Sequence, residues 1–241
     1  MNITKRLAQI VALAATLAIV PCAGFAATVW DLANDFSTST NPNGVWTYGT
    51  TPTLNGAFTL FTTSFNHGGL QIWASVPEVL PIVGYNPTGS LINAYGTVVV
   101  PANSTLLHPG AAGEYAVVQW TAPAAGDYNL STLFSPLDVV GTTTDVHVFS
   151  GSTELFGGFV TGVYGSSNSQ AYSNILTGLN TGDVLSFAVG KNANGNANDY
   201  YYDSTGLKVN ITSVPEPGVM TMLTGLMSAG TLFSFRRLKR S

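Results

Sequence analysis

The stretch EYAVVQWTAPAAGDYNLSTLF, residues 114–134, decides the fold class of this chain. Apolar and polar residues alternate in EYAVVQW (114–120) and again in DYNLSTLF (127–134), which is the period of a half-buried β-strand. TAPAAG lies between them, where Pro123 ends the first strand and Gly126 opens the second. The stretch therefore predicts two neighbouring strands joined by a short turn.

The same pattern recurs along the body of the chain, while helical periodicity is nearly absent. TTDVHVFS (143–150) and TELFGGFV (153–160) are separated by Gly-Ser, and a glycine at the first turn position is typical of a two-residue hairpin. Further strand patterns occupy residues 56–65, 70–76, 96–101, 183–190 and 206–213. Many short strands with Gly, Pro and Asn between them predict an all-β fold, an antiparallel, jelly-roll-like β-sandwich over residues 27–212.

Charge is scarce and unevenly distributed in the 241 residues. Charged residues make up 8% of the chain, against roughly 25% in ordinary soluble domains. The body between Thr28 and Thr212 holds 2 basic and 11 acidic residues, a net charge of −9. Nucleic-acid binding needs a basic surface, so this balance excludes it as a function. Abundant aromatic and β-branched residues also argue against disorder.

The N-terminus has the three zones of a secretory signal peptide. MNITKR is basic, LAQIVALAATLAIV is apolar, and PCAGFAA is small and helix-breaking. We expect the Sec translocon and signal peptidase to process residues 1–26, with cleavage between Ala26 and Ala27. The alternative is a retained membrane helix, but an apolar core of about 14 residues is short of the ~20 that span a bilayer. Cys22 is the only cysteine, so the exported body would fold without disulfides.

The C-terminus has the composition of a membrane anchor. Residues 218–235 carry no charge and would reach about 27 Å as a helix, enough for a hydrocarbon core. A basic stop-transfer cluster follows at 236–241, made of Arg236, Arg237, Lys239 and Arg240. Because basic residues stay in the cytoplasm, this transmembrane helix would leave the body outside the inner membrane.

A proline-flanked glutamate precedes the predicted helix, and the two prolines hold it extended. The order of a Pro-Glu-Pro triplet at 215–217, an apolar helix and a basic end resembles a PEP-CTERM sorting signal, here residues 213–241. The resemblance implies a Gram-negative bacterium, recognition by an exosortase, and cleavage at a motif formed by Val214, Pro215, Glu216 and Pro217. It also implies a protein of the cell surface or extracellular matrix, associated with exopolysaccharide and biofilm. The competing interpretation is a plain anchor that contains the triplet by chance.

Two body segments, residues 117–134 and 176–190, carry a looser resemblance to jelly-roll carbohydrate-binding modules and to the bodies of other PEP-CTERM proteins. Residues 41–49 and 200–207 resemble the bodies of other PEP-CTERM proteins. This resemblance implies a jelly-roll fold and makes a sugar a candidate ligand.

Catalytic motifs are not evident. His67 and His108 lie in turn sequences, and the chain has no H-E-x-x-H or G-x-S-x-G motif. His147 and Asp145 share one face of a predicted strand, which we interpret as a surface hydrogen bond. We interpret Glu114 and Glu154, beside strand starts and turns, as solvated charges rather than a glycosidase pair. We expect no catalysis, and a hydrolase with a hidden site is the least favoured alternative.

Two ligand hypotheses come from the loops and the aromatic residues. Calcium takes oxygen ligands from loops, and Asp31 and Asp203, near the first and last elements, are its candidate ligands. Sugar rings stack on exposed aromatic faces, and the candidates are Trp46, Tyr48 and Tyr201. The alternatives are that the aspartates make turns and that the aromatic residues build the core. Trp120, which alternates with Val118, is predicted to be core.

Together these features predict an exported, non-catalytic surface or matrix protein. The alternative is a carbohydrate-binding module with a defined sugar site. A glycan-binding assay discriminates between the two.

Overall fold

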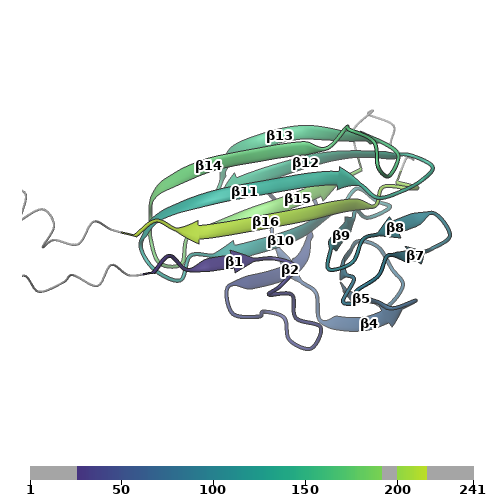
Figure 1. Cartoon of the computed structure of the whole chain (residues 1–241), viewed down its shortest axis with the longest axis horizontal. Coiled ribbons are helices and arrows are strands. Elements are labelled where there is room, and N and C mark those ends of the chain that lie inside the picture. The colour runs from purple at the N-terminus through teal and green to yellow at the C-terminus, as the bar shows by residue number, and fades with distance from the viewer. Residues whose placement is uncertain (1–25, 192–199, 216–241) are drawn as a thin grey trace, which may run out of the picture. The chain divides into compact units, whose positions relative to one another are not determined.

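The computed structural model describes residues 26–191 and 200–215, and in these ranges the chain forms strands and no helix (Figure 1). No segment of these ranges is therefore a helix that could cross a membrane. Nearly all of the predicted signal peptide, the predicted transmembrane helix at 218–235 and the basic tail lie outside the described residues. The contacts of the described body group residues 27–214 into one unit.

The first large sheet has eight strands, all paired antiparallel, in the order β14-β11-β16-β9-β6-β5-β4, with β1 also against β16. Its strands are β1 (Val29–Asp31), β4 (Thr63–His67), β5 (Leu70–Ala74), β6 (Ile82–Tyr85), β9 (Thr105–His108), β11 (Gly126–Pro136), β14 (Gln170–Leu179) and β16 (Thr205–Ser213).

The second large sheet has six strands, also antiparallel, in the order β13-β12-β15-β10-β2-β3. Its strands are β2 (Trp46–Thr51), β3 (Thr59–Leu60), β10 (Tyr115–Thr121), β12 (Thr142–Ser150), β13 (Thr153–Gly162) and β15 (Val184–Gly190). A separate two-stranded ribbon joins β7 (Ile92–Ala94) to β8 (Val98–Val100).

Strand β16 organises the first sheet. It pairs with β11 along its whole length, while β9 and β1 lie end to end on its other side. β9 pairs with Thr205–Leu207, whereas β1 pairs with Asn210–Thr212. Beyond β1, the N–H of Ser213 donates to the carbonyl of Thr28 (2.9 Å). Both ends of the described body therefore lie at one end of β16, and the segment before Thr205 lies at the other.

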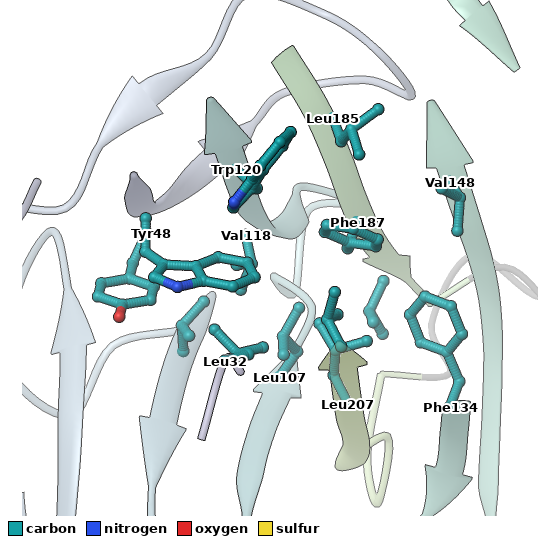
Figure 2. Close-up of a cluster of buried hydrophobic side chains, with 14 of the residues drawn as sticks. Leu32, Tyr48, Leu107, Val118, Trp120, Phe134, Val148, Leu185, Phe187 and Leu207 are labelled. Carbon is teal, nitrogen blue, oxygen red and sulfur yellow. The ribbon is translucent and has the colours of Figure 1, made fainter. Parts of the chain in front are cut away.

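The main core lies between the two large sheets and is built by strict alternation (Figure 2). Every second residue of each central strand points into it. From the second sheet come Val118, Trp120, Val148, Leu185 and Phe187, and from the first Leu107, Leu130, Phe134, Leu207 and Ile211. Trp120 is completely buried and lies edge-on to Tyr128 and Trp30, with ring centroids 5.0 and 5.6 Å away. The prediction that Trp120 is core is confirmed.

A second, smaller core lies between the β7–β8 ribbon and strands β5, β6 and β9. It contains Leu70, Ile72, Ala74, Ile82, Ala94, Val98, Val100, Leu106 and Leu137. The ribbon thus has an apolar underside that it buries against the first sheet. This packing fixes the position of the loop between β7 and β8.

The predicted all-β antiparallel architecture is confirmed for the described residues. The two-residue hairpin is confirmed too, with Gly151 at φ +57° between paired Ser150 and Thr153. The single strand predicted at 56–65 is wrong, because the chain forms two short strands there, β3 and β4, which join different sheets. Strands β1, β2, β6, β7, β9 and β14 were not predicted.

Candidate ligand pocket

Two of the three predicted sugar-stacking residues are core residues. Trp46 is 1% exposed and Tyr48 is 0% exposed, and Figure 2 shows Tyr48 among the buried side chains. They lie two residues apart on β2, so they share the face that packs on the first sheet. Phe36 stacks on Tyr48 at a centroid distance of 4.5 Å. The prediction that Trp46 and Tyr48 bind sugar is therefore wrong.

The third residue, Tyr201, is 60% exposed, and its neighbour Tyr202 is 43% exposed. Both line a pocket of about 280 Å³. We call it the tyrosine pocket and define it by Glu78, Tyr95, His108, Asp138, Tyr201 and Tyr202. These residues come from five separate segments of the chain, so no local motif in the sequence indicates the pocket.

The apolar wall of the pocket belongs to the second core. Ile82 of β6, Val98 of β8 and Leu106 of β9 line it, and each is at most 5% exposed. Their positions are fixed by strand pairing and by packing under the ribbon. The pocket thus has a firm apolar wall, and its exposed tyrosines lie outside that core.

Unusual backbone conformations gather at this pocket. Five non-glycine residues of the described ranges have positive φ, and three of them line it: Glu78 (+60°), Tyr95 (+50°) and Tyr202 (+68°). Side chains larger than asparagine rarely adopt this region. Such conformations persist where the surroundings hold them, and they cluster at functional sites.

A small network holds Tyr95 and Glu78 together at the mouth. The Tyr95 hydroxyl donates to one Glu78 oxygen (3.2 Å), and His67 Nδ1 lies 2.9 Å from the other. His67 also stacks on the Tyr95 ring, with centroids 3.8 Å apart. Burial and the Glu78 carboxylate raise the pKa of Tyr95, so its hydroxyl stays protonated and remains a donor to Glu78.

Acceptors line the interior of the pocket. Asp138 is completely buried, and its carboxylate accepts from the Thr97 hydroxyl (2.8 Å) and the Val140 N–H (2.8 Å). Burial lowers the pKa of His108 against the opposing effects of the Pro109 carbonyl and Asp138. The ring is therefore neutral near pH 7. Because a carbonyl can only accept, His108 Nδ1 carries the proton toward Pro109 (2.9 Å), and Nε2 is left as an acceptor.

The combination of groups is suited to a ring that carries polar donors. Tyrosine faces pack against apolar C–H surfaces and attract cations. The carboxylates and the His108 Nε2 accept hydrogen bonds from hydroxyl or amine groups. Small-molecule sites are usually concave and largely apolar with a few placed polar groups, as this pocket is.

The predicted His147–Asp145 pair forms, but it belongs to a larger network on the outer face of the second sheet. His147 Nε2 lies 2.9 Å from Asp145 and Nδ1 lies 2.6 Å from Glu154. The Tyr115 hydroxyl donates to Asp145 (2.7 Å), and this contact passes over Gly190 of β15. Glu154 is therefore a partner of His147 and not only a turn charge. No local pattern in the sequence indicated Tyr115, which lies on a different strand.

Opposing effects set the protonation of His147. Burial lowers its pKa, but the hydrogen bonds and charges of Asp145 and Glu154 outweigh it, so the pKa is raised above 6.5. Facing a carboxylate at each nitrogen, the ring donates from both when it is charged. The network thus ties β10, β12 and β13 together across the sheet.

The two predicted calcium ligands lie far apart. Asp31 pairs with Asn210 on β16, whereas Asp203 precedes the start of the same strand at Thr205. Thr205 and Asn210 are five residues apart along the strand, roughly 17 Å. Asp31 accepts from two backbone N–H groups of its own turn, and Asp203 accepts from Thr143. One ion cannot bind both carboxylates. No group of three acidic, His or Cys side chains suited to a metal occurs in the ranges that the structure describes.

The predicted processing sites lie at the margins of the described body. Ala26 and Ala27 are exposed ahead of β1. Val214 donates its N–H to the Asp127 carbonyl (2.9 Å), and the next residue, Pro215, is exposed. Glu216, Pro217 and the basic cluster lie outside the described residues, so cleavage by signal peptidase and by exosortase stays a prediction.

Comparison with known proteins gives no family. No family model and no curated protein matches the chain. A cyclase from Fischerella sp. TAU is 11% identical over 79% of this chain and 98% of its own, with a TM-score of 0.39. A family 35 carbohydrate-binding module from Clostridium thermocellum is 16% identical over 64% and 100%, with a TM-score of 0.27. The C-terminal CBM6 of LamC from Zobellia galactanivorans is 14% identical over 45% and 80%, also at 0.27. Likenesses this weak carry no argument about function.

Proposed function

We propose that this chain is an exported bacterial surface or matrix protein whose body binds a saccharide in the tyrosine pocket without catalysing a reaction. The observation that carries the proposal is the exposure of Tyr201 and Tyr202 beside Tyr95, around a pocket whose interior polar groups accept hydrogen bonds. Two antiparallel sheets around one core are the architecture of a jelly roll, which we propose as the finer description of the fold.

The size and chemistry of the pocket favour a short saccharide unit. A volume of about 280 Å³ lies just below the range of typical ligand pockets, roughly 300–1,000 Å³. This volume suits a single pyranose ring, with the adjoining sugar unit outside the pocket, better than a longer stretch of polysaccharide. The C–H face of the ring would lie on Tyr201 or Tyr202, and its hydroxyls would donate to Glu78 and His108 Nε2.

The export and sorting part of the proposal is supported by the sequence of both tails. The basic, apolar and small-residue zones at the N-terminus support secretion, and the resemblance to a PEP-CTERM signal supports an exosortase as partner. The body's two ends leave from the Thr28–Ser213 end of β16. The pocket lies near Thr205, about 25 Å along that strand. A tail held in a membrane would then leave the pocket accessible.

Saccharide binding is tested by a glycan array and by pull-down with insoluble polysaccharides, using the full chain. Tyr201→Ala should lower the affinity at least about tenfold, the loss of one stacking contact. Phe159→Ala is the matched control, because Phe159 is a 54% exposed aromatic on β13, away from the pocket. Failure of the native chain to bind any glycan, or unchanged binding by Tyr201→Ala, would contradict the proposal.

Sorting is tested by the intact mass of the protein recovered from outside its native cells. A C-terminus within 215–217, with or without an attached group, supports exosortase cleavage. A mass that includes Arg240 would mean that the tail is a permanent anchor.

A further inference from the structure

We propose that the tyrosine pocket selects a saccharide unit that carries a positively charged amine, over neutral and acidic sugars. This inference rests on the proposed function, because it names the ligand class of the same pocket. It follows from the charges and ring faces of the pocket and from where the basic residues of the body lie.

Both charged residues that line the pocket are acidic. Glu78 lies at the mouth, where its side chain is 51% exposed, and Asp138 lies at the floor, completely buried. The described body holds two basic residues, and neither lines the pocket. Lys208 lines a different hollow, next to β11, and Lys191 donates to the Ala111 carbonyl (2.6 Å).

The Glu78 carboxylate retains capacity for a ligand. Its side chain is 51% exposed, and each of its oxygens has one protein partner. An ionised carboxylate has about four acceptor positions, so Glu78 can accept further donors, while the buried Asp138 adds negative charge without a direct contact. An ammonium group brings three N–H donors, and a charge-assisted hydrogen bond is about twice as strong as a neutral one.

The tyrosines add a second attraction for the same charge. A cation within about 6 Å of a tyrosine ring centroid is attracted by the negative ring face. His67 covers one face of the Tyr95 ring, so the exposed rings of Tyr201 and Tyr202 offer this attraction, in the same pocket as the Glu78 carboxylate. An amine in the pocket can interact with both, whereas a neutral N-acetyl group lacks the charge and a uronate is repelled by the carboxylates.

The experiment measures the affinity of the full chain for three probes: chitosan oligosaccharides, chitin oligosaccharides and oligogalacturonate. The pH is kept below the pKa of the chitosan amine and the ionic strength is low. We expect chitosan to bind at least about tenfold more tightly than chitin, and oligogalacturonate not to bind. The chitosan preference should shrink at high salt, where the Debye length falls to about 3 Å.

Glu78→Gln separates the charge from the shape of the pocket. It should remove most of the chitosan preference while leaving chitin affinity within about twofold. Glu114→Gln, which changes a carboxylate outside the pocket, should keep the preference. Equal affinities for chitosan and chitin in the native chain, or an unchanged preference in Glu78→Gln, would overturn the inference and leave saccharide binding standing. No binding of any saccharide would overturn both.

Discussion

His147 lies between two carboxylates, and its charge state links folding stability to pH. Its pKa in the folded protein is raised above the ordinary 6.5, because Asp145 and Glu154 outweigh the effect of burial. A raised pKa contributes stability that is complete below pH 6.5 and is lost as the pH rises through the folded value. We expect His147→Asn to reduce the free energy of unfolding more at about pH 5.5 than at about pH 8.5.

Urea denaturation at both pH values measures this difference. The native chain alone is a poor readout, because the pKa of His108 is lowered by burial. That shift works in the opposite sense, removing stability as the pH falls below 6.5. The comparison of native and variant chains cancels the His108 contribution. An equal loss of stability at the two pH values would show that the charge of His147 contributes nothing.

Removal of the Trp120 side chain should cause the largest loss of packing energy in the core. This side chain is completely buried between the sheets and contacts two aromatic rings. Trp120→Ala should lower the free energy of unfolding by about 3–5 kcal/mol, measured by urea denaturation at constant pH. Phe159→Ala, at an exposed position, should change it by about 0.5 kcal/mol or less. A Trp120→Ala cost near that of Phe159→Ala would mean that the core tolerates the cavity.

Contacts between side chains that are close in the sequence could be predicted, but contacts with residues from distant strands could not. Trp46 and Tyr48 were singled out as aromatic residues, but β2, the strand that carries them, was not predicted, and their burial depends on the opposite sheet. The pairing of Asp145 with His147 followed from their spacing of two. Tyr115 joins them only because β10 and β12 both flank β15, which no local pattern indicates.

Among the elements, the β12–β13 hairpin depends on one glycine. Gly151 has φ +57°, and nothing lies within 4 Å of the position of an added Cβ. A substitution there therefore tests backbone strain without a steric clash. Gly151→Ala should cost about 1 kcal/mol of unfolding free energy, and Ser152→Ala, the matched neighbour, should cost little. Thermal and urea denaturation check this, and equal effects would contradict the strain argument.

Strong alternation predicted the long strands, while weak alternation and short length concealed others. β10, β11, β12, β13, β15 and β16 all lie within two residues of their predicted bounds. β14 was missed because Leu176 is its only buried residue, and its apolar residues do not alternate with polar ones. The order of the strands in the sheet could not be predicted from the sequence either, since β16 pairs with β1, about 180 residues earlier.

For the whole molecule, composition predicted the acidic body, but the pocket arises from topology. Five segments between Glu78 and Ser204 meet there because β6, β9 and β16 are neighbours and the β7–β8 ribbon folds over them. A sequence without a recognisable catalytic or binding motif can therefore still form a pocket, when strand pairing brings distant residues together. Tyr201 was identified by its residue type alone.

The outer face of the first sheet is the rival binding surface. A shallow hollow over β11, β14 and β16 is lined by Asn129, Ser131, Ser173, Asn174, Asn210 and Thr212, among others. These amides and hydroxyls could also bind sugar hydroxyls, but none of the residues that line this hollow is aromatic. The tyrosine pocket offers both kinds of contact, and for this reason we favour it.

The most direct test of saccharide binding in the tyrosine pocket is NMR of the full chain with labelled tyrosine rings and backbone amides, titrated with chitosan oligosaccharides. We predict that the ring signals of Tyr95, Tyr201 and Tyr202 shift together, while Tyr115 and the amides of Asn129 and Asn210 do not. Shifts confined to Asn129, Asn210 and their neighbours would move the site to the outer face of the first sheet. Either that result or the absence of any shift would contradict the account.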